Sequence, residues 1–415
     1  MLPPVLEVYV VHHPGDDEGR RAAEQLFEHF HGASYIGLIG GAIELYVRSA
    51  SWSAGGSGAP RAIPFPGKAD ANGVSAAEVV AIVPCVGLEL ARAVEARGPW
   101  ADFLEGIVGA ANAAPDRVGV FPLRLGEAGG HDTLLAKLLS PFQFIAAPSG
   151  LGPPEPEAEC RARDLAQGLA QLILGPESRL QVFISHTRRT GLGEDEDVPA
   201  LIRYVREIIS ETRLRSFFDA SDLQAGRDWD TDLRRNAATS ALLALRTDLY
   251  AGRVWCQREM LTAKRAGMPV VILDSLGRGE ERGSFLMDHI PRIPVRADGA
   301  DWSKPDIRRS LNLLVDECLK RAIWGIQQKL GAARGDLAAA WWAPHAPEPI
   351  TLTHWLREQA ASGTKVLGSM PLRILHPDPP LGPDEREALA ELLQLTGHDG
   401  GLDVMTPRGL AARGG

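Results

Sequence analysis

The sequence predicts an α/β protein built around a flavodoxin-like parallel sheet at residues 180–290. A second α/β domain of Rossmann-like type is expected before this sheet, and a small mixed α/β tail after it. Three observations support the prediction: short strands alternate with helical patterns, the strands are apolar on both faces, and a spacer rich in proline and glycine interrupts the alternation. Strands that are apolar on both faces require helices on both sides of a mostly parallel sheet.

The first expected domain covers residues 1–144. It opens with the buried-strand pattern LEVYVV at residues 6–11, followed by the polar loop HHPGDDEGR and an amphipathic helix. Further strands are expected at 43–47, 79–84 and 118–123, with a helix around 100–111. The next region, residues 145–179, holds the spacer APSGLGPPEPEAE and a helix at 160–174.

In the second expected domain, residues 180–290, the hydrophobic patterns of strands and helices alternate most clearly. Its strands are expected at 180–186, 213–219, 241–245 and 269–273, and its helices include 198–210 and 254–265. In such sheets the ligand crevice lies at the carboxyl ends of the strands. The remainder, residues 291–415, begins with a long amphipathic helix and continues as a small α/β region.

Composition and charge narrow the class of protein. A chain of 415 residues exceeds the size of one hydrophobic core, and 45% hydrophobic with 23% charged residues is ordinary globular composition. The net charge of -9 argues against broad electrostatic attachment to nucleic acid or to an anionic membrane, so we expect neither partner.

The spacing of the cysteines and the lengths of the apolar runs indicate the cellular compartment. The four cysteines form no CxxC pair, which predicts neither a disulfide framework nor a cysteine zinc site. No apolar run reaches the length of a bilayer, and the start of the chain lacks the basic region of a secretory signal. We therefore expect a cytoplasmic protein.

Three sequence blocks, in order, resemble the TIR (Toll/interleukin-1 receptor) domain family. They are VFISHT at 182–187, FFDASDLQAGRDW at 217–229 and WCQREM at 255–260, the last matching the family's W-C-x-x-E. The resemblance covers roughly a quarter of the chain. The preceding stretch ALLALRTDLY stands where the family usually has an apolar strand leading to Ser and Tyr, and this sequence has Arg246 and Thr247 instead.

Resemblance to this family implies one of two functions. One is an NAD glycohydrolase or cyclase that becomes active on self-assembly, with NAD as its substrate and no cofactor. The other is a non-catalytic adaptor that assembles through the same domain. In bacteria, TIR domains fused to other modules commonly resemble effectors of anti-phage defence, and the resemblance leaves room for an activating ligand or partner protein.

The candidate catalytic residue is Glu259. Nicotinamide leaves NAD as a neutral group without protonation, so the site needs a fixed carboxylate that stabilises the oxocarbenium character of the ribose. Trp255 and Glu259 are four positions apart and share a helix face, so we expect Trp255 to pack that face while the carboxylate enters the crevice. The alternative is a solvated glutamate paired with Arg258 or Lys264.

Further candidate substrate contacts follow the first two strands. Ser185 and His186 end the first strand, where they contact ribose or phosphate or make a strand-end hydrogen bond. The loop and helix start after the second strand offer backbone amides, a cation and an aromatic face. The candidates in this segment are Asp222, Gly226, Arg227 and Trp229, with packing or assembly favoured over direct substrate contact for Arg227 and Trp229, and Trp255 is a further candidate contact. The resemblance also implies that this loop reaches a neighbouring subunit.

Several other polar groups are expected to be structural, and we predict no metal site. The acidic stretch at 194–197 is expected at the start of a helix, where negative charge interacts favourably with the helix dipole. A solvated loop is expected for the group His12, His13, Asp16 and Asp17. Cys256 lacks an identifiable histidine partner and is expected to be a small buried hydrophobe.

The first domain carries a similar Trp and Glu pair without the same spacing. Glu105 follows Trp100 by five positions, which rotates the carboxyl group away from the tryptophan. We therefore expect residues 1–144 to be a Rossmann-like or degenerate TIR-like module without catalysis.

Two alternatives to NAD cleavage stay open. A TIR scaffold would bind a protein or nucleotide and would tolerate Glu259→Ala, whereas an enzyme resembling nucleoside deoxyribosyltransferases would act on free nucleosides and ignore NAD. The NAD-cleaving interpretation requires the Glu259 side chain to face the sheet edge. A side chain turned to bulk water and remote from any cavity would leave only the scaffold.

Overall fold

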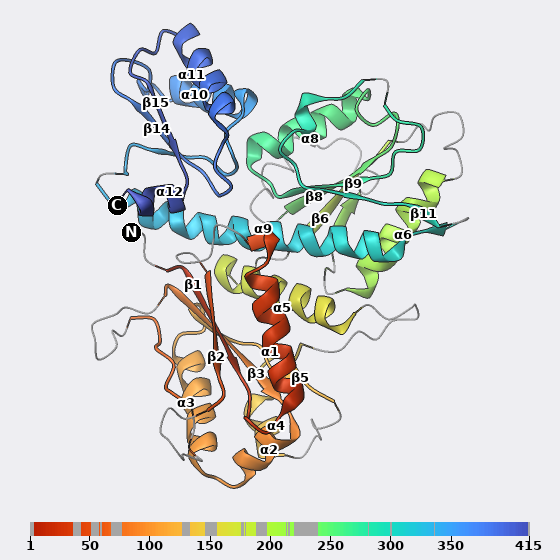
Figure 1. Cartoon of the computed structure of the whole chain (residues 1–415), viewed down its shortest axis with the longest axis vertical. Coiled ribbons are helices and arrows are strands. Elements are labelled where there is room, and N and C mark those ends of the chain that lie inside the picture. Colours follow the sequence, from red (N-terminus) through yellow and green to blue (C-terminus); the bar gives the residue numbers. More distant parts are fainter. Residues whose placement is uncertain are drawn as a thin grey trace. The chain divides into compact units, whose positions relative to one another are not determined.

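The computed structural model of the 415-residue chain describes two compact units, residues 2–178 and 179–415. The described residues are 4–35, 43–50, 58, 60–67, 77–126, 133–145, 156–175, 178, 180–187, 197–212, 214, 216–219, 240–280, 282–298, 301–335 and 337–413. Figure 1 traces the whole chain in sequence order.

The first unit is organised around a parallel sheet with the order β2-β1-β3-β4, and β5 pairs with the end of β3. Its strands are β1 (Leu6–Val11), β2 (Ile43–Arg48), β3 (Val79–Val86), β4 (Val118–Val120) and β5 (Leu123–Arg124). Every residue of β1 and β3 is buried, because these β-branched and apolar segments lie in the middle of the sheet with helices on both faces.

Helices cover both faces of this first sheet. They are α1 (Asp17–Phe30), α2 (Leu88–Glu95), α3 (Pro99–Ala113), α4 (Leu134–Leu139) and α5 (Glu157–Leu174), with a short 3-10 turn η1 (Ala33–Tyr35). On one face α2, α3 and α4 pack together over Tyr9, Val80 and Ile82, and on the other α1 contacts α5 (Figure 1).

The second unit contains an all-parallel sheet with the order β10-β9-β8-β6-β7. The strands are β6 (Gln181–Ser185), β7 (Ser216–Asp219), β8 (Ser240–Arg246), β9 (Val270–Asp274) and β10 (Arg292–Pro294). Numbered within the unit, this is the order 2-1-3-4-5 of flavodoxin-like sheets, in which the strand order reverses between β6 and β8.

The described helices that flank this sheet lie on opposite faces of it (Figure 1). They are α6 (Asp197–Glu211), α8 (Val254–Ala266) and α9 (Lys304–Ala332), and a 3-10 turn η2 (Phe285–Met287) contacts α8. The apolar stripe of α8, including Cys256, Met260 and Ala263, packs on Leu242 and Ala244 of β8. On the other face α9 contacts α6, β8, β9 and β10.

The chain ends in a small parallel module, residues 341–413, here called the tail module. It consists of β13 (Trp341–Trp342), α10 (Pro349–Ala361), β14 (Leu372–Leu375), α11 (Pro383–Leu395), β15 (Leu402–Met405) and α12 (Pro407–Ala412). Its strands are parallel in the order β13-β14-β15, and they share a core with Leu352 and Leu389 of the helices. A two-stranded antiparallel ribbon, β11 (Ala297–Asp298) with β12 (Asp301–Trp302), precedes α9.

The predicted α/β class with parallel sheets is confirmed by both units. The sequence did not anticipate the short strands β10, β11, β12, β13 and β15 or the helices α2, α4 and α12. Strand β10 lies beyond residue 290 and pairs with β9, so the sheet of the second unit extends past the expected boundary. In the part of the chain that the structure describes, no helix combines the length and apolarity needed to cross a membrane.

Candidate active site at the carboxyl edge of the second sheet

The Glu259 side chain points into the protein rather than toward solvent. It lies in the second turn of α8 and is 2% exposed. Ser185, the last residue of the interior strand β6, donates a hydrogen bond from its hydroxyl to Glu259 Oε2. The carboxylate is therefore held at the carboxyl end of an interior strand, close to the point where the strand order reverses.

Tyr250 extends this contact into a chain of hydrogen bonds. Its hydroxyl oxygen lies 2.6 Å from Ser185 Oγ, and the residue is 1% exposed. Because the single hydroxyl proton of Ser185 is donated to Glu259, the Tyr250 hydroxyl must donate to Ser185. Burial raises the pKa of Tyr250 well above its ordinary value, with Cys256 and Glu259 adding to the rise, so the phenol stays protonated and remains a donor.

Sequence reasoning did not single out Tyr250 as a site residue. The available signal was its place at the end of ALLALRTDLY, the stretch that stands where the TIR pattern has an apolar strand leading to Ser and Tyr. The position of Tyr250 relative to Ser185, which is 65 residues earlier, depends on the tertiary structure.

Two further buried hydroxyl groups lie at the same edge. Thr187 and Thr247 follow β6 and β8, are 3% and 2% exposed, and have their hydroxyl oxygens 3.3 Å apart. Together with Ser185 and Tyr250 they place four buried, uncharged hydroxyl groups at or beyond the ends of β6 and β8 among the residues that the structure describes. Such groups can accept or donate hydrogen bonds to a polar ligand without adding charge.

His186 lies beside a different surface from Glu259. Successive residues of a strand project to opposite faces, and His186 follows Ser185 directly. It lines an open groove of about 410 Å³ together with one face of α6, formed by Pro199, Ile202, Arg203, Arg206 and Glu207. Glu259 is not among the lining residues of this groove, so the two candidates at the end of β6 face different surroundings.

The expected packing role of Trp255 is wrong. Trp255 is 50% exposed in the first turn of α8, whereas Glu259 one turn later is buried. The stripe that meets the sheet runs through Cys256 and Met260, and Trp255 lies outside it. The aromatic face of Trp255 is thus partly open to solvent.

Cys256 is a buried side chain, as expected. It is 2% exposed, and burial together with the charge of Glu259 raises its pKa to about 12. The thiol is protonated at neutral pH and cannot act as a thiolate nucleophile there.

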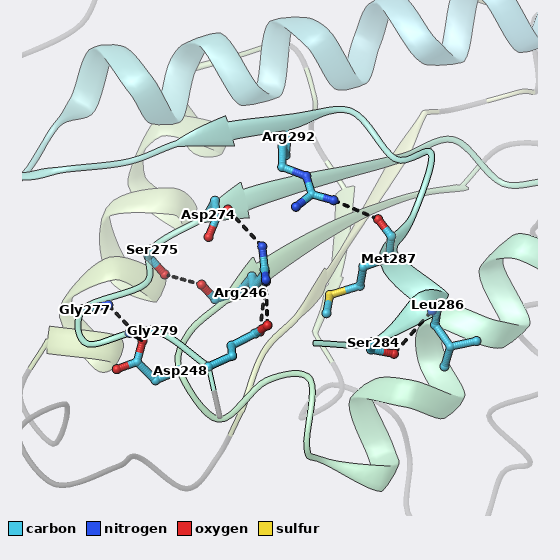
Figure 2. A network of polar contacts seen from close by, with 11 residues as sticks. Arg246, Asp248, Asp274, Ser275, Gly277, Gly279, Ser284, Leu286, Met287 and Arg292 are labelled. Atoms are coloured by element: carbon cyan, nitrogen blue, oxygen red, sulfur yellow. Dashed lines mark hydrogen bonds and ion pairs between the residues drawn. The ribbon is translucent and has the colours of Figure 1, made fainter. Parts of the chain in front are cut away.

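The loops beyond β8 and β9 are fixed by a polar network (Figure 2). Arg246 donates two hydrogen bonds to the Glu280 carboxylate, at 2.9 and 2.6 Å, and a third to Asp274 Oδ2 at 3.0 Å. Asp248 accepts the backbone N–H groups of residues 277–279 at 2.8 to 3.1 Å. Arg246 therefore has a structural role, because its guanidinium joins the end of β8 to the loop after β9.

The four predicted loop residues lie outside the described residues. Asp222, Gly226, Arg227 and Trp229 belong to this group, as do the acidic positions 194–196. Their proposed contacts with NAD or with a neighbouring subunit stay predictions.

The polar loop after β1 is only partly solvated, so the expectation of a solvated loop is wrong for two of its residues. His12 and Asp16 are 5% and 9% exposed. The Asp16 carboxylate accepts the backbone N–H groups of Glu89 and Leu90 at 2.9 and 3.0 Å, which caps the N-terminus of α2. Within the described residues, no group of three or more histidine, cysteine or acidic side chains could hold a metal ion.

The corresponding pair of the first unit has the opposite orientation. Trp100 is 4% exposed and belongs to the core over α3, whereas Glu105 is exposed. In the second unit the carboxylate is buried and the tryptophan is exposed. The two helices therefore present their tryptophan and glutamate side chains in opposite ways, and the exposed Glu105 serves as a control for Glu259.

Neither the models of known protein families nor the curated protein sequences give a match to this chain.

Proposed function

We propose that the second unit is a TIR-type NAD glycohydrolase or cyclase, with Glu259 as the carboxylate that stabilises the ribose cation. The observation that supports this most directly is the buried Glu259 carboxylate, oriented by Ser185 and Tyr250 at the carboxyl edge of a sheet with the order 2-1-3-4-5. A carboxylate removed from water interacts more strongly with a developing positive charge than a solvated one does. The hydroxyl chain keeps the carboxylate in a single orientation.

We propose in addition that the site works only after self-assembly. A carboxylate that is 2% exposed must have its surroundings rearranged before a ribose can approach it. Assembly of several copies through the TIR domain is the rearrangement that the family resemblance suggests. Consumption of NAD on assembly is the chemistry of an effector, in keeping with a role in anti-phage defence.

The test is an NAD turnover assay over a range of protein concentrations. Nicotinamide release by the wild-type chain should rise more steeply than linearly with protein concentration. Glu259→Gln preserves the size of the side chain and removes its charge, and it should lower turnover by on the order of 100-fold. Glu105→Ala is the matched control and should leave turnover unchanged. Absence of turnover in every assembly state, or equal turnover in Glu259→Gln, would remove the proposal.

A non-catalytic scaffold is the second candidate, favoured by one specific observation. Glu259 is buried and does not line the groove beside His186, so its carboxylate can serve simply as an internal acceptor for Ser185. A scaffold predicts that the wild-type chain self-associates but releases no nicotinamide in any assembly state, whereas the enzyme releases nicotinamide on assembly and loses this activity in Glu259→Gln. Sedimentation velocity establishes the assembly state in which nicotinamide release is measured.

A further inference from the structure

A buried ion pair joins the helix that carries Glu259 to the tail module. Lys264 Nζ lies 2.8 Å from both carboxylate oxygens of Glu348 and 2.8 Å from the backbone carbonyl of Asp288. The two side chains are 6% and 10% exposed. Glu348 is also the N-cap residue of α10, where its side chain accepts the N–H of the third helical residue, so the pair links α8 directly to the first turn of α10.

The C-terminal end of α8 is held by distant parts of the chain at two more points. The carbonyl of Gly267 accepts a hydrogen bond from Arg321 Nε at 2.9 Å, and His345 Nε2 lies 3.1 Å from the carbonyl of Met268. Gly267 itself has a left-handed backbone with φ of 64°, and a Cβ atom there would lie 2.7 Å from Pro344. The last turn of α8 is thus enclosed by residues 54 to 84 positions later in the sequence.

Helix geometry connects this anchor to the candidate catalytic group. Lys264 follows Glu259 by five residues, which corresponds to about 7.5 Å along the axis and about 140° around it. The two side chains therefore leave α8 in different directions, Glu259 toward β6 and Lys264 toward the tail module. Because both side chains are held by partners outside the helix, α8 can neither rotate about its axis nor slide along it without breaking one of these contacts.

A buried ion pair is a weak source of stability, because the cost of desolvating both charges offsets their attraction. Its best supported use is to select one register of packed elements. An apolar pair at this position would allow α8 to turn about its axis, whereas Lys264 has to meet the two oxygens of Glu348 and the carbonyl of Asp288 at once.

We propose that Glu348 and Lys264 are positioning residues for the candidate site, through which the tail module fixes Glu259 against Ser185. This inference rests on the proposed NAD cleavage and adds a regulatory element to it: a partner or ligand that displaces the tail module would shift α8 and change the rate of the chemical step. The pair touches neither Ser185 nor Tyr250, so its effect on Glu259 passes through the helix backbone.

The experiment uses the full chain with Glu348→Gln, Lys264→Met and the charge-reversed double variant with Lys264→Glu and Glu348→Lys. Hydrogen exchange of the α8 amides should be at least tenfold faster in each single variant and partly restored in the charge-reversed one. In each single variant, kcat for NAD cleavage should fall about tenfold. KM should change less than twofold, because the substrate contacts are intact. Arg373→Gln is the matched control, because it removes an ion pair to Asp403 inside the tail module and should alter neither quantity.

Failure of this inference can be distinguished from failure of the proposed NAD cleavage, because hydrogen exchange of α8 is measured without NAD. Unchanged α8 exchange and unchanged kcat in Glu348→Gln would overturn the inference, as would equal losses in Arg373→Gln. If the wild-type chain does not cleave NAD, the proposed function fails and the positioning role fails with it, while the exchange data still decide whether the ion pair fixes α8.

Discussion

The hydroxyl oxygens of Ser185 and Tyr250 lie 2.6 Å apart, and both residues are at most 1% exposed. Ser185 ends strand β6, and Tyr250 follows β8, the neighbour of β6 in the sheet. The contact therefore bridges the two strands between which the strand order reverses. Through it, the orientation of the Glu259 carboxylate depends on the loop that leads into α8.

This chain of hydrogen bonds should behave as one unit on mutation. Tyr250→Phe leaves Ser185 Oγ without its donor and should lower the free energy of opening of β6 and β8 by about 1 kcal/mol. Ser185→Ala removes the donor to a buried carboxylate and should cost about 2 kcal/mol. The double variant should lose less than the sum of the two, because both changes break the same chain. Native-state hydrogen exchange of the strand amides measures all three, and strict additivity would contradict the chain.

Removal of Arg246 should release the loop after β9. Its side chain is 13% exposed, and Glu280, which it binds through two hydrogen bonds, is 5% exposed. Arg246→Ala leaves a buried carboxylate without its cation and should destabilise the second unit by about 3 kcal/mol. Arg20→Ala on α1 is the control, since its partners Asp17 and Glu24 are solvent-exposed and the change should stay within about 0.5 kcal/mol. Similar shifts in urea unfolding for both variants would exclude a special role for Arg246.

Two glycines of α9 should respond in opposite directions to alanine. A Cβ atom at Gly331 would overlap the ring of Trp342, whereas one at Gly325 meets nothing within 4 Å. Gly325→Ala should stabilise the helix by about 0.5 to 1 kcal/mol, because alanine restricts the unfolded chain. Gly331→Ala should be destabilising by about 1 to 3 kcal/mol through overpacking against β13. Thermal unfolding of the two variants provides the comparison, and a higher melting temperature for both would show that Trp342 moves without cost.

The second unit should lose stability in mild acid, in part through His345. Burial, with the nearby charge of Arg321, lowers the pKa of His345 from its ordinary 6.5 to about 4. Between pH 4 and pH 6.5 the unfolded chain binds a proton at His345 that the folded chain does not bind. The contribution of His345 to the free energy of unfolding is therefore complete above pH 6.5 and declines as the pH falls toward 4. His345→Gln should therefore show a smaller fall in melting temperature between pH 7 and pH 4.5 than the wild-type chain. Parallel curves for the two proteins would contradict the assignment.

The regular elements of both units follow from local patterns in the sequence. Strand β1 is predicted at residues 6–11 and found at Leu6–Val11, and α8 is predicted at 254–265 and found at Val254–Ala266. Both carry a strong signal, a run of β-branched residues in one case and a helical period ending in glycine in the other. The strands β10, β13 and β15 have two to four residues each, too few for a period to be read, and they exist only because a neighbouring strand pairs with them.

For the candidate site, the sequence by itself determined which side chains are available. It also determined that Trp255 and Glu259 lie one turn apart on one helix. Only the tertiary structure decided which of the two is buried, because that depends on how α8 is rotated on the sheet. It also decided that Tyr250 meets Ser185 across 65 residues and that Lys264 meets Glu348 across 84. The physical reason is that periodicity records which residues share a face of an element, whereas the partner of that face is selected by packing between segments distant in the chain.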